Sequence, residues 1–396
     1  MIRHLFRLVW NRKKTHALIM LEILLSFIVV FALLAATTHY AELYNQPLGY
    51  STDNVWTVFV DRESREYPWT AEDARQFRRL RNELESMPEI TAVAAATNFP
   101  FSNSESVSGW GQGDLEVHAE TIHASVAYAE VFEIKLLAGR WFDETDGALD
   151  WDPVIIDKEL SRTIFGDADP LGEIIELGGP DRESRVVGLI EAFRRGGNFA
   201  TPRATLISST QEESDEGITT SNLLLKMSPN TPAVFEQTMM ERLQTLAPGW
   251  SFSVRPVADA RKQKLQQKIV PLAVFGVVGV FLLIMVILGL TGVMWQNVTR
   301  RTREIGLRRA SGASRSSIHR QIVLEVMIIA IFGVGIGAAI AMQVPFVGPF
   351  AFLPVSTAIK AVVGASVSIL LLAALCGLYP GVSATRIHPA EALHYE

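Results

Sequence analysis

Long apolar runs divide the chain into a membrane part and a polar part. A helix needs about 20 apolar residues to cross the hydrocarbon core of a bilayer. Four runs of that order predict transmembrane helices at residues 17–37, 269–294, 322–344 and 359–380. Pro271 falls in the first turn of the second run, where proline is tolerated, and Pro380-Gly381 is expected to end the fourth. The first run is longer than the apolar region of a signal peptide, so we favour an uncleaved anchor.

The polar segment, residues 38–268, has the pattern of a folded α+β domain. A strand, a helix and a strand are expected at 55–60, 71–87 and 90–96, and the same order recurs at 222–227, 233–246 and 251–257. The stretch between these two groups is rich in glycine and short apolar runs. We therefore predict an α-helical membrane protein with four transmembrane helices, plus an α+β extracytoplasmic domain of two subdomains inserted between the first and second helices. The inserted, mostly β subdomain would occupy about residues 98–209.

The polar segment joins the membrane runs without clear helix breakers. Residues 258–268 are charged and free of proline, and they run directly into the second apolar run. On the other side, no breaker follows the first run until Pro47. Both runs could continue outward as a helical stalk that transmits motion. Ordinary membrane-proximal linkers remain the alternative.

Charge separates the same parts of the chain. Residues 38–268 hold 22 Lys/Arg and 37 Asp/Glu, which argues against a nucleic-acid-binding protein. The short segments 1–16, 295–321 and 381–396 hold 13 Lys/Arg, whereas the loop 345–358 holds none. By the positive-inside rule, the three basic segments and both termini are cytoplasmic, and the loop 345–358 is outside. Residues 1–16 are expected to form a cytoplasmic amphipathic helix on the bilayer surface, with an unstructured basic flank as the alternative.

The connection between the second and third runs has an unusual composition. Residues 296–317 carry six arginines and one acid, Glu304. The interior suits a helix, Gly312 can end it, and Ser314 can cap the next. A DNA-reading helix-turn-helix is disfavoured because both flanks enter the membrane. The connection is either a topology signal or a docking element for a cytoplasmic partner.

Motifs for catalysis are absent from the sequence. It has no phosphate-binding loop, no zinc-binding pattern and no nucleophile elbow, and its single cysteine is Cys376. We therefore predict a non-catalytic chain without a cofactor or metal of its own. Glu22, one turn into the first run, is either a proton-relay group or a shallow acid at the interface. Gly333 and Gly337 form a G-x-x-x-G pair that serves either internal packing or a subunit interface.

Several motifs in order resemble a known family. RTREIGLRRASGA at 301–313 lies between two apolar runs, and YPGVSATRIHPAEALHYE at 379–396 closes the chain. The polar segment contains AYAEVFEIKLLAGRWF at 127–142, VIIDKELSRTIFGDADPLGEII at 154–175 and VVGLIEAFR at 186–194. Together they resemble FtsX/MacB-type ABC transporter permeases, whose periplasmic core domain the last three motifs resemble.

The resemblance implies a multi-pass protein of the bacterial inner membrane with its large domain in the periplasm. Members work as dimers with ATPase subunits, and ATP-driven closure of the ATPases moves the periplasmic domains. The expected partners are a separate ABC ATPase subunit that binds ATP and Mg, and a second permease copy or paralogue in the lipid bilayer. A periplasmic adaptor protein is a further candidate partner. The chain starts at its basic leader, so the ATPase is expected on another polypeptide.

The resemblance also places an ATPase-coupling surface in the arginine-rich connection. Carried over by position, it comprises Arg303, Glu304, Ile305, Gly306, Leu307, Arg308, Arg309, Ala310, Gly312 and Ala313. Relatives often have one basic and one apolar residue where this chain has Arg308-Arg309. Two other functions stay open: FtsX-like regulation of a periplasmic partner, and a ligand-binding membrane sensor. The second is less favoured because the tail after Pro380 is too short for an output domain.

Overall fold

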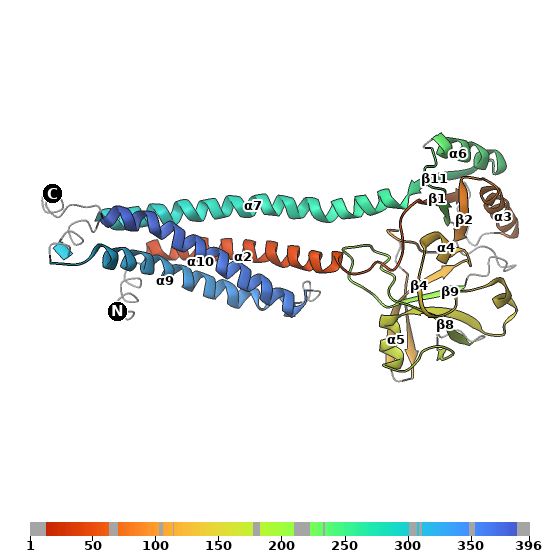
Figure 1. The fold of residues 1–396 in the computed structure, drawn as a ribbon, viewed down its shortest axis with the longest axis horizontal. Coiled ribbons are helices and arrows are strands. Elements are labelled where there is room, and N and C mark those ends of the chain that lie inside the picture. The colour runs from red at the N-terminus through yellow and green to blue at the C-terminus, as the bar shows by residue number, and fades with distance from the viewer. Residues whose placement is uncertain are drawn as a thin grey trace. The chain divides into compact units, whose positions relative to one another are not determined.

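The computed structural model consists of two compact units. It describes residues 13–62, 70–102, 106–113, 115–176, 183–209, 222–232, 234–300, 307–308, 311–347 and 353–385. The membrane unit combines Met1–Glu42 with Ile269–Glu396, and the outer unit is Leu43–Lys268. Figure 1 labels many of their helices and strands. Most of the amphipathic helix predicted at 1–16 lies outside the described residues.

A four-stranded antiparallel sheet forms one layer of the outer unit. Its strand order is β11-β1-β10-β2. The strands are β1 (Val55–Arg62), β2 (Ile90–Ala95), β10 (Asn222–Met227) and β11 (Trp250–Pro256). With helices α3 (Ala71–Glu85) and α6 (Val234–Leu246), they confirm the two strand-helix-strand groups expected from the sequence.

Helices α3 and α6 cover one face of this sheet. Thr70 and Asp73 form a capping box that starts α3. The buried side chains of α3 recur every three or four residues, which places them on one face. They share a core with α6 and with alternate residues of the strands: Leu80, Leu84, Met239, Leu243, Val58, Leu223 and Leu225.

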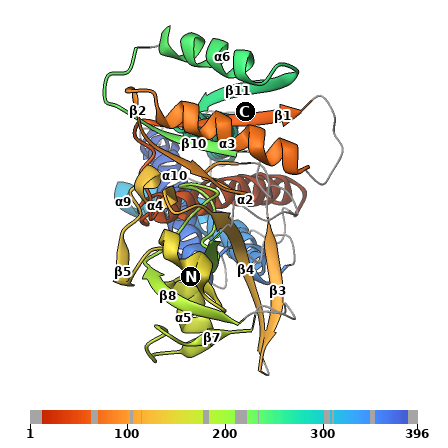
Figure 2. The ribbon, with the colours of Figure 1, turned by 90° about the vertical axis from the view of Figure 1, so that its right-hand side faces the viewer.

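A seven-stranded mixed sheet forms the second layer (Figure 2). Its order is β3-β4-β9-β6-β8-β5, with β7 paired to β8. The strands are β3 (Val107–Gln112), β4 (Leu115–Ala124), β5 (Leu136–Gly139), β6 (Asp152–Asp157), β7 (Ile174–Ile175), β8 (Ser184–Ile190) and β9 (Thr205–Ser209). Two short helices, α4 (Tyr128–Phe132) and α5 (Lys158–Phe165), accompany them.

The two sheets share a core between them. Leu224 of β10 faces this core, whereas its neighbours Leu223 and Leu225 face α3 and α6. In β6, Ile155 faces the shared core, and Val154 and Ile156 pack with α5. Successive side chains of a strand point to opposite faces, so both central strands are buried on both sides. Since one core joins the sheets, the division into two subdomains stays a prediction.

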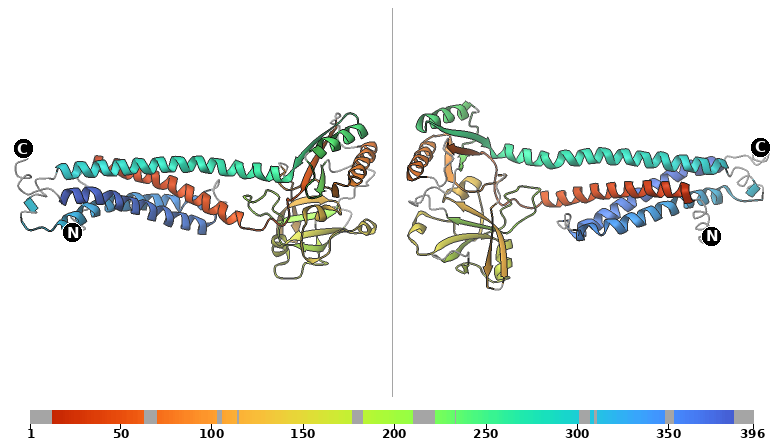
Figure 3. Two further views of the ribbon diagram at one scale, coloured as in Figure 1. Left: turned by 45° about the horizontal axis from the view of Figure 1, so that its top comes forward. Right: turned by 180° about the vertical axis from the view of Figure 1, so that it is seen from behind.

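Among the residues that the structure describes, four long helices contribute to the membrane unit (Figure 3). They are α2 (Lys13–Tyr44), α7 (Val257–Arg300), α9 (Arg315–Ala341) and α10 (Val355–Thr385). Each contains a segment long and apolar enough to cross a membrane. They pack on a common core that includes Phe27, Leu290, Ile329 and Ile369.

Three local expectations need correction. Helix α10 begins at Val355, because the Pro354 carbonyl already accepts the N–H of Ala358 at 3.0 Å. It continues through Pro380 to Thr385, which membrane helices tolerate because neighbouring helices and local adjustments satisfy the backbone groups that proline frees. Pro271 lies deep inside α7 and not in its first turn, because the helix starts at Val257. The connection predicted at 345–358 accordingly lies at 342–354, since α9 ends at Ala341 and α10 begins at Val355.

Candidate functional site

The arginine-rich connection ends in a tight turn before α9. Gly312 has φ of +94°, a conformation that glycine adopts without strain. The N–H of Ala313 donates to the carbonyl of Arg308 at 3.0 Å, the bond that closes a helix C-terminus around such a glycine. Ser314 then accepts the N–H of Ser317 through its side chain and caps α9. The roles predicted for Gly312 and Ser314 are confirmed.

The turn is fixed to the ends of α7 and α9. Ile318 of α9 is buried and packs with Val298 of α7 and with Ala313. A guanidinium nitrogen of Arg308 donates to the side-chain oxygen of Gln321 at 3.0 Å. A force on the turn would therefore reach both helices.

Leu307 is an exposed apolar side chain of the predicted coupling surface. It is 60% exposed, and its carbonyl accepts the N–H and the hydroxyl of Ser311, each at 2.9 Å. Of the other predicted residues, Arg308, Gly312 and Ala313 are also described. Outside the described residues lie Arg303, Glu304, Ile305, Gly306, Arg309 and Ala310. Their role stays a prediction.

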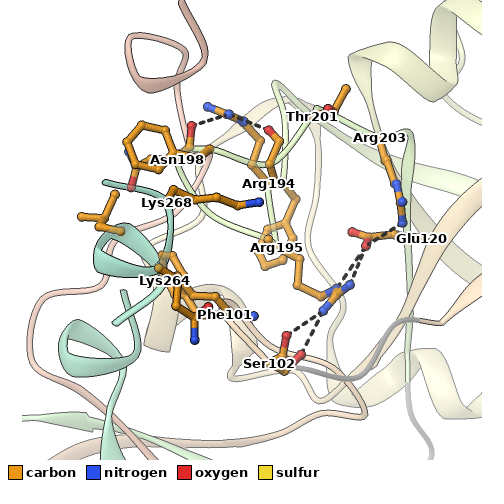
Figure 4. Close-up of a pocket in the computed structure, with 16 residues that line it drawn as sticks. Phe101, Ser102, Glu120, Arg194, Arg195, Asn198, Thr201, Arg203, Lys264 and Lys268 are labelled. Carbon is orange, nitrogen blue, oxygen red and sulfur yellow. Dashed lines mark hydrogen bonds and ion pairs between the residues drawn. The ribbon is translucent and has the colours of Figure 1, made fainter. Parts of the chain in front are cut away.

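A second candidate site is a cavity of about 450 Å³ in the outer unit (Figure 4). Its wall comes from the segment 193–203, from the first turns of α7, and from Phe101, Ser102 and Glu120. The sequence did not reveal this cavity, because its residues lie far apart in the chain. The signal available in the sequence was the adjacent pair Arg194-Arg195 in an acidic domain, shortly after the strand that ends at Ile190.

Arg194 organises the segment that forms the cavity wall. It is 4% exposed, and its guanidinium donates to four backbone carbonyls. These are the carbonyls of Leu43 at 2.8 Å, Gln46 at 3.2 Å, and Asn198 and Ala200 at 2.8 Å each. Burial lowers the pKa of Arg194, since its partners are neutral. The side chain thus holds segment 193–203 against the last turn of α2 and the residues that follow it.

Arg195 pairs with Glu120, the one acid among the described residues of the cavity wall. Its guanidinium lies 2.7 Å from a carboxylate oxygen of Glu120, and both side chains are buried. It also donates to the hydroxyl of Ser102 at 3.0 Å. Removing one partner of a buried pair leaves an uncompensated charge, so this pair fixes the wall.

Glu22 lies half-buried beside α7. A Cβ built on Gly289 would lie 2.5 Å from one of its carboxylate oxygens. A proton-relay role for Glu22 stays a prediction. Among the residues that the structure describes, no cluster of three His, Cys, Asp or Glu side chains could hold a metal ion.

Comparison with protein families decides the class of this chain. A model described as the MacB-like periplasmic core domain matches residues 17–242, more than half of the chain. A second, described as FtsX-like permease C-terminal, matches residues 276–389. The chain belongs to the MacB/FtsX-like family of ABC transporter permeases. The first match covers the first membrane run and most of the outer unit. The second match covers most of the other three membrane runs of this chain.

Curated relatives have similar sequences over most of this chain. The macrolide export ATP-binding/permease protein MacB of Neisseria gonorrhoeae is 28% identical over 316 residues, which are 76% of this chain and 47% of the relative. A probable export ATP-binding/permease protein of Pseudomonas fluorescens is 25% identical over 289 residues, 71% of this chain and 44% of the relative. The chain spans about half the length of these relatives.

Solved structures of related domains also match. The periplasmic region of MacB from Actinobacillus actinomycetemcomitans is 20% identical, with a TM-score of 0.40, and the match covers 57% of this chain and 98% of that one. The extracellular domain of the noncanonic ABC-type transporter YknZ from Gram-positive bacteria is 16% identical, with a TM-score of 0.36, covering 50% and 100%.

Proposed function

We propose that this chain is the permease subunit of an ABC transporter complex in which ATP hydrolysis moves the outer unit. A separate ATPase subunit would bind ATP and Mg, and the permease would work with a second copy or a paralogue. The movement would drive efflux or extraction of a substrate from the periplasm or the membrane. Membership of the permease family supports this function.

In this proposal the chain lies in a bacterial inner membrane with both termini in the cytoplasm. The outer unit is periplasmic, and its two sheets act as two subdomains. The distribution of Lys and Arg supports the orientation, because the short segments on the proposed inner side hold 13 of them.

The observation that carries the proposal is the continuity of α7. Strand β11 ends at Pro256 and α7 begins at Val257, so no linker separates them. The helix then continues for 44 residues to Arg300, at the start of the arginine-rich connection. At 1.5 Å per residue, this is about 66 Å of unbroken helix. Such an element can transmit displacement along its length, which a flexible linker cannot.

The ATPase would dock on the arginine-rich connection. Leu307 supplies an exposed apolar anchor, and the turn that holds it is fixed to α7 and α9. Glu304 is the single acid among the six arginines and would face the partner. Closure of two ATPases would then displace the turn and, through α7, the outer unit.

The test is the double substitution Glu304→Ala with Leu307→Ala. Truncating a central interface anchor often costs about 2 kcal/mol or more, so ATPase association should weaken by at least about 30-fold. ATP-dependent movement should be lost, while membrane insertion is retained. The measurements are co-purification of the ATPase and a distance probe between the outer units of the two permeases, with and without nucleotide.

The same substitutions at Glu236 and Leu246 provide a matched control. Both residues lie on α6 in the outer unit, and both are exposed. This variant should bind the ATPase and move normally. If the Glu304/Leu307 variant also keeps its ATPase and its movement, the connection is not the coupling element.

A further inference from the structure

The charged side chains that line the cavity of the outer unit are mostly basic, whereas those of the surrounding segment are mostly acidic. Residues 38–268 contain more acids than bases, 37 against 22. Among the residues that the structure describes, the cavity wall instead contains five basic side chains and one acid: Arg194, Arg195, Arg203, Lys264, Lys268 and Glu120. This ratio is the reverse of the ratio in the whole segment.

The single acid does not balance the bases. Glu120 is occupied by Arg195 in the buried ion pair, and Arg203 lies 4.0 Å from the same carboxylate oxygen. Arg194 donates to backbone carbonyls, which carry no net charge. The described part of the wall therefore keeps a net positive charge.

Helix α7 directs a face of cations towards the cavity. Arg261, Lys264 and Lys268 are spaced by three and four residues and lie on one side of the helix. Nε of Arg261 donates to the side-chain oxygen of Asn198 at 3.1 Å, which fixes this side against segment 193–203. Lys264 and Lys268 line the cavity, whereas their neighbour Lys262 does not.

The remaining wall mixes polar and apolar side chains, with Ser102, Asn198, Thr201 and Gln267 among the polar ones. Phe101, Phe193, Phe199 and Leu265 line the cavity beside the cations. Walls of low dielectric strengthen the field of nearby charges and concentrate counter-ions of opposite sign. Arg and Lys side chains converging on one space are suited to a phosphate group, which offers several acceptor oxygens.

We propose that this cavity binds the phosphate group of an anionic ligand, with Arg203, Lys264 and Lys268 as its cationic contacts. Arg194 and Arg195 hold the wall in place. Two sources present this chemistry. Lys268 directly precedes Ile269, the first residue of the second apolar run, so a phospholipid headgroup is one source. A free phosphorylated solute is the other.

The experiment compares three forms of the full chain: wild type, Lys264→Gln with Lys268→Gln, and the control Lys262→Gln on the same helix. In the first arm, inorganic phosphate is titrated calorimetrically into protein in phosphatidylcholine nanodiscs, at constant ionic strength. In the second arm, nanodiscs also contain phosphatidylglycerol, and native mass spectrometry counts the anionic lipids that stay bound. No nucleotide or ATPase is present, so the result is independent of the proposed transport function.

We expect the wild type and Lys262→Gln to bind, and the double variant to bind about tenfold more weakly, in at least one arm. Loss in the phosphate arm identifies a free solute as the ligand source, and loss in the lipid arm identifies a headgroup. Lys264→Arg with Lys268→Arg should restore binding, which excludes a folding defect as the cause. The proposal is overturned if the wild type binds neither probe, or if Lys262→Gln weakens binding as much as the double variant.

Discussion

At the scale of single residues, Asp157 couples the outer unit to pH. It is 2% exposed at the end of β6, and its carboxylate accepts the N–H of Leu160 at 2.8 Å as the N-cap of α5. Burial disfavours the charged form more than these hydrogen bonds favour it, which raises the pKa of Asp157 to about 7. The folded state therefore binds this proton more tightly than the unfolded state, where the pKa is close to 3.8.

The sign of the resulting pH dependence follows from linkage. The stabilisation by the protonated form is complete below about pH 4 and is lost as the pH rises towards 7. Asp157→Asn keeps a neutral capping group, so it should remove this loss, which amounts to at most about 1.4 kcal/mol per pH unit. Thermal unfolding of the full chain in detergent, followed by tryptophan fluorescence, measures the effect.

The control for Asp157 is Asp143, the exposed N-cap residue of a short 3-10 helix, Glu144–Ala148. Hydrogen bonds from Thr145 lower the pKa of Asp143, so this group stays charged between pH 5 and 8. Asp143→Asn should therefore leave the pH dependence of thermal stability in this range as in the wild type. Equal pH dependence in the wild type and the Asp157→Asn variant would show that Asp157 does not titrate in this range.

At the scale of secondary-structure elements, the surroundings of Gly333 and Gly337 in α9 show the role of the G-x-x-x-G pair. A Cβ on Gly333 would lie 2.8 Å from Cγ2 of Ile23, and one on Gly337 would lie 2.5 Å from Cδ1 of Phe27. Both contacts are with α2 of the same chain. The pair therefore serves packing within the membrane unit, where small residues allow close approach of helices.

Gly337→Leu should accordingly destabilise the membrane unit. The added side chain must displace Phe27, and overpacking of this kind costs about 1–3 kcal/mol. Gly335→Leu is the matched control, because a Cβ there meets no described atom within 4 Å. Thermal stability of the two variants in the same detergent should differ, with Gly337→Leu the lower. Equal stability would argue against packing on α2.

At the scale of the whole molecule, thiol labelling tests the orientation of the chain. The single native cysteine, Cys376, is 8% exposed, so its background should be low. Gln46→Cys, Ser356→Cys and Ser311→Cys each place a thiol at an exposed position. An impermeant reagent outside spheroplasts should label the first two and leave the third unlabelled, because the arginine-rich connection is expected inside. Labelling at Ser311, or none at Ser356, would contradict the four-helix topology.

Local patterns in the sequence determined the elements. An apolar run of membrane length has few alternatives to a helix, because every backbone group needs a partner in lipid. The strand-helix-strand groups were likewise readable from their periodicity, and Gly312 and Ser314 from the special backbone that each favours. The ends of α10 were harder to predict, because the helix starts directly after Pro354 and continues through Pro380.

Tertiary structure decided how these elements combine. Leu223, Leu224 and Leu225 look alike in the sequence, yet they face two different cores, because two sheets and two helices enclose the strand. Gly337 packs on Phe27, a residue more than 300 positions away. The cavity joins Glu120, Arg195 and Lys264 from distant parts of the chain. Such contacts depend on which faces meet in three dimensions, and periodicity along the chain carries no information about that.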